Sequence, residues 1–261
     1  MTKTLRVGKH EFSSRLILGT GKYATFALMD AALAESGTQC VTVAVRRVPL
    51  SQPGVEAGHR EPTILDHIPK SCVILPNTAG CFTAEEAVRT ARLAREFGLS
   101  DLLKLEVLYN QESLLPEPIE TLKALEVLVK DGFTVMVYCG DDPVLAKRYE
   151  ERGAAAVMPL GSAIGSGLGI LNPHNVAFIV AHAKVPIIVD AGLGCASDVA
   201  QAMEIGADGV IVNTAVAKAA DPVAMARAMR LGCEAGRWSF LAGRAAPSAG
   251  APSSPVEGVV R

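Results

Sequence analysis

The sequence of 261 residues lacks several features that mark whole classes of protein. Its 25 basic and 27 acidic residues give a formal net charge of -2, so no global field favours DNA, RNA or an anionic membrane. The apolar runs stop well short of the roughly 18 residues that a membrane-spanning helix needs. Charged side chains interrupt residues 1–18, where a secretory signal would need an unbroken apolar stretch. We therefore expect a cytoplasmic protein with no nucleic-acid or membrane partner.

Cysteine and histidine patterns typical of metal sites are also missing. No two cysteines form a C-x-x-C pair, so the spacing indicates neither a zinc site nor a disulfide framework. They are expected to be small buried residues. The five histidines show no metal-ligand spacing. The sequence therefore predicts neither a metal nor a cofactor.

Short runs rich in β-branched residues alternate with longer segments of helical periodicity, which is typical of βα units and a parallel sheet. The strands are expected at 15–20, 40–46, 72–76, 102–108, 133–139, 155–160, 186–190 and 209–213. The helices are expected at 24–36, near 63–69, and at 83–97, 116–131, 143–152, 173–183, 196–206 and 221–236. Glycines follow many of these helices, where a left-handed residue commonly ends a helix. They are Gly37, Gly98, Gly132, Gly153, Gly206 and Gly236.

Eight strands and eight helices in strict alternation predict a (β/α)8 TIM barrel, a single catalytic domain over residues 1–244. An open doubly wound sheet is the alternative. The turn Gly19–Lys22 after the first strand argues against it, because it lacks the third glycine of a dinucleotide fingerprint. Residues 245–261 are rich in Ala, Pro and Ser, and we expect this tail to be disordered.

The strand at 102–108 carries two charged residues on an otherwise apolar background. Alternation puts Leu103 and Leu105 on the face toward the helices, so Lys104 and Glu106 point into the barrel. An ionised group is costly there unless it is paired or has a shifted pKa. One interpretation is a structural ion pair. The other is a lysine desolvated enough to be a neutral amine, which attacks a carbonyl and forms a Schiff base beside a carboxylate that transfers protons.

Further candidate groups lie where barrel chemistry is usually found, at the carboxyl ends of strands. Asp190 ends the strand at 186–190, although such an Asp can also be a helix cap. Glycine-rich or small-residue turns follow three strands, at 161–169, 191–194 and 213–215. Glycine lets backbone N–H groups approach a ligand closely, so these turns are candidates for binding phosphate.

Several motifs in order resemble the thiazole synthase family of thiamin biosynthesis, from about Arg15 to Arg244. They are Asn77-Thr78-Ala79-Gly80-Cys81, Lys104-Leu105-Glu106-Val107, Met158-Pro159-Leu160-Gly161-Ser162, Gly165-Ser166-Gly167-Leu168-Gly169, Val189-Asp190-Ala191-Gly192 and Asn213-Thr214-Ala215. The resemblance implies a (β/α)8 enzyme, a transferase of sulfur-containing groups. Such an enzyme builds the thiazole phosphate from 1-deoxy-D-xylulose 5-phosphate, dehydroglycine and sulfur.

The resemblance also implies roles and partners. Lys104 would form the imine with the sugar ketone, with Glu106 and Asp190 as acid and base. The sugar phosphate would be bound by Gly165, Ala191, Gly192, Asn213 and Thr214. The sulfur would come from a ubiquitin-like sulfur-carrier protein with a thiocarboxylated carboxyl-terminal glycine, and the enzyme would be a homo-oligomer.

Two other functions fit the residues. Another Schiff-base barrel acting on phosphosugars, aldolase-like or pyridoxal phosphate synthase-like, would keep Lys104 and the phosphate turns but need no sulfur carrier. A non-catalytic barrel module would use Lys104 and Glu106 only as a structural pair.

Overall fold

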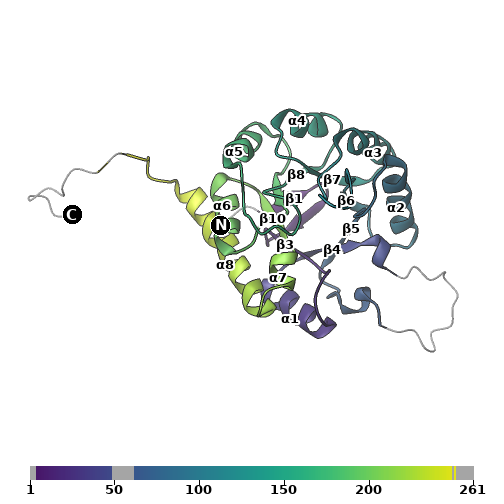
Figure 1. The fold of residues 1–261 in the computed structure, drawn as a ribbon, viewed down its shortest axis with the longest axis horizontal. Helices are drawn as coiled ribbons and strands as arrows, with labels where there is room; N and C mark the ends of the chain where they lie inside the picture. The colour runs from purple at the N-terminus through teal and green to yellow at the C-terminus, as the bar shows by residue number, and fades with distance from the viewer. Residues whose placement is uncertain (1–3, 49–61, 249, 251–261) are drawn as a thin grey trace, which may run out of the picture.

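The computed structural model describes residues 4–48, 62–248 and 250, and it shows a ring of parallel strands enclosed by helices (Figure 1). The strands are β1 (Leu5–Val7), β2 (His10–Phe12), β3 (Leu16–Gly19), β4 (Cys40–Ala44), β5 (Val73–Asn77), β6 (Leu102–Leu105), β7 (Thr134–Cys139), β8 (Ala156–Pro159), β9 (Ile188–Asp190) and β10 (Gly209–Val212). The α-helices are α1 (Phe26–Ser36), α2 (Ala84–Glu96), α3 (Pro118–Lys130), α4 (Pro143–Glu151), α5 (Pro173–His182), α6 (Ala196–Ile205), α7 (Thr214–Ala217) and α8 (Pro222–Ala242), with 3-10 turns η1 (Val45–Arg47) and η2 (Ile64–His67).

The sheet confirms the predicted (β/α)8 barrel. Its eight parallel strands follow the order β8-β7-β6-β5-β4-β3-β10-β9. Two parallel bridges, between Val157 and Ile187 and between Leu160 and Asp190, join β8 to β9 and close the ring. An open doubly wound sheet is thereby excluded, and the carboxyl ends of all eight strands meet at one mouth.

Apolar side chains fill the barrel below that mouth. Every barrel strand contributes at least one, and β7 and β8 contribute two: Ile17, Cys40, Leu75, Leu102, Met136, Tyr138, Ala156, Met158, Ile188 and Ile211. The antiparallel hairpin β1–β2, which the sequence patterns did not predict, adds Leu5, Val7 and Phe12 to this cluster. The hairpin therefore plugs the amino-terminal end of the barrel interior, so a ligand of the interior has to enter from the carboxyl-terminal end.

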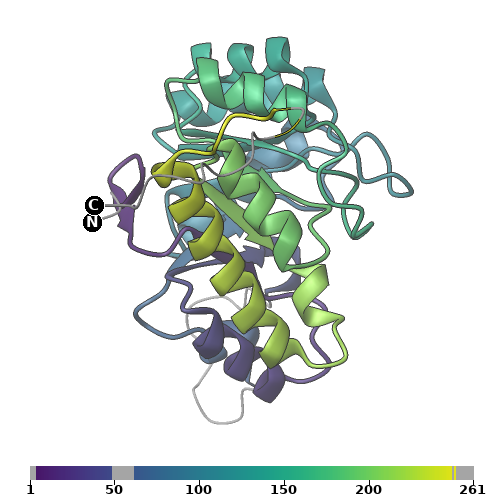
Figure 2. The same cartoon turned by 90° about the vertical axis from the view of Figure 1, so that its left-hand side faces the viewer.

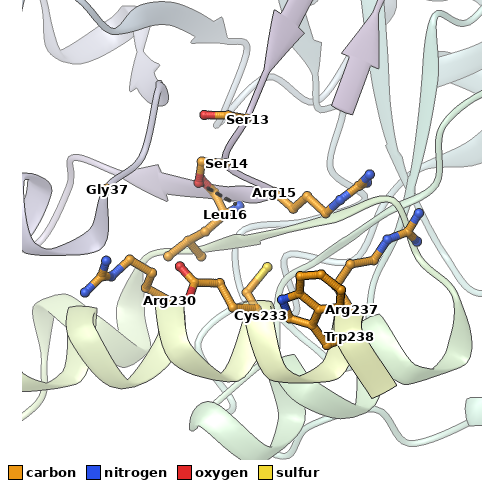
Figure 3. Close-up of a pocket in the computed structure, with 10 residues that line it drawn as sticks. Ser13, Ser14, Arg15, Leu16, Gly37, Arg230, Cys233, Arg237 and Trp238 are labelled. Carbon is orange, nitrogen blue, oxygen red and sulfur yellow. Dashed lines mark hydrogen bonds between the residues drawn. The ribbon is translucent and has the colours of Figure 1, made fainter. Parts of the chain in front are cut away.

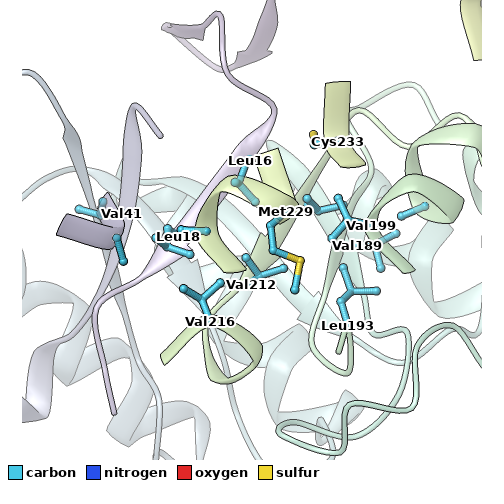
Figure 4. Close-up of a cluster of buried hydrophobic side chains, with 14 of the residues drawn as sticks. Leu16, Leu18, Val41, Val189, Leu193, Val199, Val212, Val216, Met229 and Cys233 are labelled. Carbon is cyan, nitrogen blue, oxygen red and sulfur yellow. The ribbon is translucent and has the colours of Figure 1, made fainter. Parts of the chain in front are cut away.

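The outer faces of the strands pack against the helices. One cluster joins β3, β4, β9 and β10 to α1, α6 and α8, with Met229 of α8 near its centre (Figure 4). A second cluster joins β6 and β7 to α2, α3 and α4. Leu103 and Leu105 belong to the second cluster, as the alternation in their strand predicted.

Helix α8 differs most from expectation, because Gly236 lies inside it and does not end it. α8 runs beside α6 (Figure 2), and a Cβ at Gly236 would lie 2.8 Å from the Ala200 Cα. Gly236 is therefore a residue of close helix packing, and α8 continues to Ala242. The expected helix near 63–69 is the 3-10 turn η2, and α7 was not predicted. Among the described residues, no helix is both long and apolar enough to cross a membrane.

The predicted tail falls largely outside the described residues. Residues 245–248 and 250 carry no helix or strand, and 249 and 251–261 are not described. The boundary at 244 and the disorder of the tail stay predictions.

Candidate active site

Lys104 lies inside the barrel near its mouth. β6 pairs with β5 and β7, and Lys104 stands opposite Asn77 and Met136 in these ladders. Its side chain follows Leu102 on the inward face, and the residue is only 6% exposed. An amine in this position is shielded from bulk water and lies on the carboxyl-terminal side of Leu102 inside the barrel.

Two carboxylates surround the Lys104 ammonium. Its Nζ donates a hydrogen bond to Asp190 Oδ2, from the end of β9, and lies 3.8 Å from Glu106 Oε2. Both carboxylate residues are buried. Tyr138 stands two residues beyond Met136 toward the carboxyl end of β7, and the centroid of its ring lies 5.5 Å from Lys104 Nζ. The barrel therefore brings together all three residues that the sequence singled out for catalysis.

The balance of burial and charge corrects one expectation from the sequence. Burial lowers the pKa of Lys104, but Asp190 and Glu106 outweigh it and hold that pKa above its ordinary value. The lysine is therefore an ammonium at neutral pH and not the neutral amine that desolvation alone would produce. Burial raises the pKa of Glu106, more than the charge of Lys104 lowers it. Glu106 therefore holds its proton more readily than an exposed glutamate does, which suits it to donate a proton.

Thr78 is a supporting residue to which the sequence patterns assigned no task. Its hydroxyl donates to the Glu106 carbonyl and accepts from the Glu106 N–H, both at 2.8 Å. Thr78 is completely buried. Because β6 ends at Leu105, this clamp fixes the backbone of Glu106 just beyond the strand. A threonine two residues after the predicted strand at 72–76 was the available signal, within the motif Asn77–Cys81.

The predicted phosphate turns converge beside this triad. Ala191 and Gly192, directly after Asp190, both have left-handed backbones, with φ of 72° and 78°. A side chain at Gly165 would lie 3.9 Å from Thr214 Oγ1, which places these two loops together. Within the described chain, the backbone N–H groups of Gly165, Gly192 and Thr214 make no hydrogen bond. Unpaired amide donors, one of them on buried Gly192, suit an anionic ligand.

Asn213 joins this region to the turn after β3. A Cβ at Gly19 would lie 2.5 Å from the Asn213 Cβ, so only glycine allows the turn to approach so closely. The Asn213 Oδ1 is buried without a hydrogen-bond partner among the described residues. Lys22, in the same turn, donates to Thr214 Oγ1 at 3.0 Å. In the sequence, this turn argued only against a dinucleotide fold, because it lacks the third glycine, and no local pattern connected it with the phosphate loops.

Gly192 permits a direct prediction on stability. At this residue a Cβ would lie 2.5 Å from the backbone N of Ser162, whereas at Gly132, with φ of 81°, it would meet nothing within 4 Å. Gly132→Ala should therefore cost only the backbone strain of about 1–2 kcal/mol. Gly192→Ala should cost about 1–3 kcal/mol more, because the loops must move apart. Urea unfolding of both variants measures the difference, and equal losses would contradict the close packing of these loops.

Other cavities lie away from the mouth. One of about 220 Å³ opens at the amino-terminal end between β3 and α8, lined by Arg15, Arg237 and Trp238 among others (Figure 3). A mostly apolar groove of about 520 Å³ lies between α4 and α5 on the outer surface. Neither contains a predicted site residue.

No group of three or more possible metal ligands occurs among the described residues. Four cysteines are buried, but Cys195 is exposed, contrary to expectation.

Known proteins resemble this chain over nearly its whole length. A family model described as thiazole biosynthesis protein ThiG matches residues 6–255. The thiazole synthase of Maricaulis maris (strain MCS10) is 56% identical over 260 residues, which cover 99% of this chain and 95% of that protein. The thiazole synthase of Paramagnetospirillum magneticum is 57% identical over 251 residues, covering 95% of this chain and 76% of that protein.

A solved structure is also similar. A chain of the BexX/CysO complex from Amycolatopsis orientalis matches with a TM-score of 0.82 and 29% identity. The match covers 95% of this chain and 100% of that chain.

Proposed function

The chain belongs to the ThiG family of thiazole synthases, enzymes of thiamin biosynthesis, and from that premise we propose how its barrel mouth performs the reaction. Lys104 forms an imine with the ketone of 1-deoxy-D-xylulose 5-phosphate. Glu106 and Asp190 move the protons, and the loops around Gly192 and Thr214 bind the phosphate. The observation that carries this proposal is a buried lysine held by two carboxylates next to unpaired amide donors.

Imine formation needs a neutral amine, and the site contains the group that can produce it. The Lys104 ammonium transfers a proton to Asp190, with which it is hydrogen-bonded. The free amine adds to the ketone carbon, and one of its protons moves to the former carbonyl oxygen, which becomes a hydroxyl. Glu106, whose raised pKa favours the acid form, protonates this hydroxyl and water leaves. The carbon–nitrogen double bond then replaces the carbon–oxygen bond without any change in oxidation state.

The later steps require proton transfers between carbon, nitrogen and oxygen. The imine makes the protons on the neighbouring carbon more acidic. A carboxylate beside that carbon removes one of these protons and returns it to another carbon, nitrogen or oxygen atom of the intermediate. Asp190 ends β9 and Glu106 directly follows β6, so the two carboxylates approach the imine nitrogen from different strands of the barrel wall. Dehydroglycine and sulfur then complete the ring.

The sulfur donor is proposed to be a small carrier protein with a thiocarboxylated carboxyl-terminal glycine. The similar Amycolatopsis chain was solved in complex with a second protein, CysO, which supports a protein partner for this barrel as well. Because the β1–β2 hairpin plugs the amino-terminal end, an extended tail would have to enter through the mouth that Lys104 faces.

Dependence on the carrier tests this function. The protein is incubated with the sugar phosphate, dehydroglycine and either the thiocarboxylated or the unmodified carrier, and products are separated by chromatography. We expect thiazole phosphate only with the thiocarboxylate. A carbon–carbon cleavage product formed without any carrier would instead support the aldolase-like alternative.

A cytoplasmic homo-oligomer is also proposed. Large apolar side chains on α8, Leu231, Trp238 and Leu241, are about half exposed or more, as expected of a contact between copies. Light scattering of the full chain measures the assembly, and a monomer at micromolar concentration would contradict it.

A further inference from the structure

We propose that Lys22 is the residue that makes this site select a phosphorylated ketose over the same sugar without phosphate. The inference rests on the proposed function, because it names the group that recognises the phosphate of the sugar bound at Lys104. It adds a side-chain cation to a site that otherwise consists of neutral backbone donors.

The turn after β3 is built to bring Lys22 against the phosphate loops. Gly19 is packed on the Asn213 side chain, and a Cβ at Gly21 would lie 2.8 Å from the Arg47 Nη1. Lys22 itself has a φ of 73°, in the left-handed region that side chains other than glycine seldom adopt. Strained residues of this kind gather at ligand sites, where the surrounding structure holds them. A glycine would adopt this conformation without strain. The presence of lysine here therefore indicates that its side chain has a function.

The ammonium of Lys22 reaches the point where two phosphate loops meet. Its Nζ donates to Thr214 Oγ1 at 3.0 Å and would lie 3.8 Å from a side chain at Gly165. The backbone N–H groups of Thr214 and Gly165 are the unpaired donors described above. Three donors from three separate loops therefore surround one small region, and one of them carries a full positive charge.

This charge has no carboxylate partner. Within the described residues, no Asp or Glu lies within ion-pair distance of Lys22. By contrast, Arg46 on the next loop donates to the carbonyl of Gly80. A lysine ammonium binds phosphate as a point charge, and hydrogen bonds to ionised groups are about twice as strong as neutral ones. The unpaired ammonium is therefore the feature that separates a dianionic sugar phosphate from a neutral sugar.

The test compares two substrates that differ only in the phosphate. Initial rates of borohydride-trapped imine are measured with 1-deoxy-D-xylulose 5-phosphate and with 1-deoxy-D-xylulose, for the parent, Lys22→Met and Lys22→Gly. Both variants should lose about 10- to 100-fold in the rate per unit concentration of the phosphorylated sugar. The rate with the unphosphorylated sugar should stay within about twofold of the parent, since charge-assisted binding is not used there.

Lys22→Gly separates recognition from folding, because glycine adopts a φ of 73° without strain. This variant should therefore unfold at the parental urea concentration or a higher one. Lys218→Met is the matched control: it removes the same charge from an exposed lysine four residues beyond Thr214, and should keep the parental preference. Parental preference in Lys22→Gly would overturn the inference, and so would an equal loss in Lys218→Met. No imine in the parent itself would contradict the proposed function instead.

Discussion

Lys104→Ala should form no imine with 1-deoxy-D-xylulose 5-phosphate and should lose thiazole formation by on the order of 10⁴-fold or more, as expected when a covalent nucleophile is deleted. The lysine is the buried amine between Asp190 and Glu106, and replacing it removes the only atom that can form the bond to the ketone carbon at that position. Borohydride reduction followed by mass spectrometry of peptides measures the adduct. In the parent, one sugar phosphate should be found on the peptide that contains Lys104.

Lys123→Ala is the matched control, because Lys123 also pairs with a carboxylate, Glu120 at 2.6 Å, but is 62% exposed on α3. It should keep the full adduct and the full turnover. An undiminished adduct in Lys104→Ala, or one mapped to Lys70, Lys123 or Lys147 in the parent, would show that the imine forms elsewhere. Circular dichroism must show that Lys104→Ala is folded, since removal of the lysine leaves two buried carboxylates facing each other.

The placement of Lys104 could be predicted from sequence because alternation is a local property. In a strand, neighbouring side chains point to opposite faces, so an apolar set at Leu103 and Leu105 sends Lys104 inward whatever the rest of the chain does. The barrel itself followed from the count and alternation of short apolar runs. Even the strand ends were located to within a few residues, because parallel strands buried on both faces are nearly continuous in apolar residues.

Properties that depend on distant parts of the chain were not accessible in this way. The pKa of Lys104 depends on Asp190, which lies 86 residues away in the sequence. No local pattern specifies how close the two side chains lie in the folded protein. Gly236 was misread as a helix end, because a glycine that allows close packing against Ala200 looks the same in sequence as one that ends a helix. The role of Lys22 likewise depends on Thr214, which only closure of the barrel between β3 and β10 brings near.

Asp190→Asn should keep the imine yet lose about 10²- to 10⁴-fold in thiazole formation, the usual contribution of a positioned acid or base. Asp190 holds the pKa of Lys104 up, whereas burial pulls it down. Removing its charge should therefore lower the pKa of Lys104 and enlarge the fraction of neutral amine at pH 7. In the parent, the rate of imine formation should rise steadily as the pH is raised toward the high pKa of Lys104. In Asp190→Asn this rise should occur at lower pH.

Glu106→Gln gives the comparison within the same site, because Glu106 lies 3.8 Å from Lys104 Nζ whereas Asp190 accepts a hydrogen bond from it. Its effect on the pH profile of imine formation should be smaller. Its loss of turnover should still reach about 10²-fold, since it removes the carboxyl whose raised pKa suits proton donation. Trapped-adduct rates between pH 6 and 10 and thiazole yields at pH 7.5, for both variants, separate the two effects. Parental turnover in both would make the carboxylates structural supports of Lys104, and an unshifted profile in Asp190→Asn would contradict the conclusion that Asp190 holds the pKa of Lys104 up.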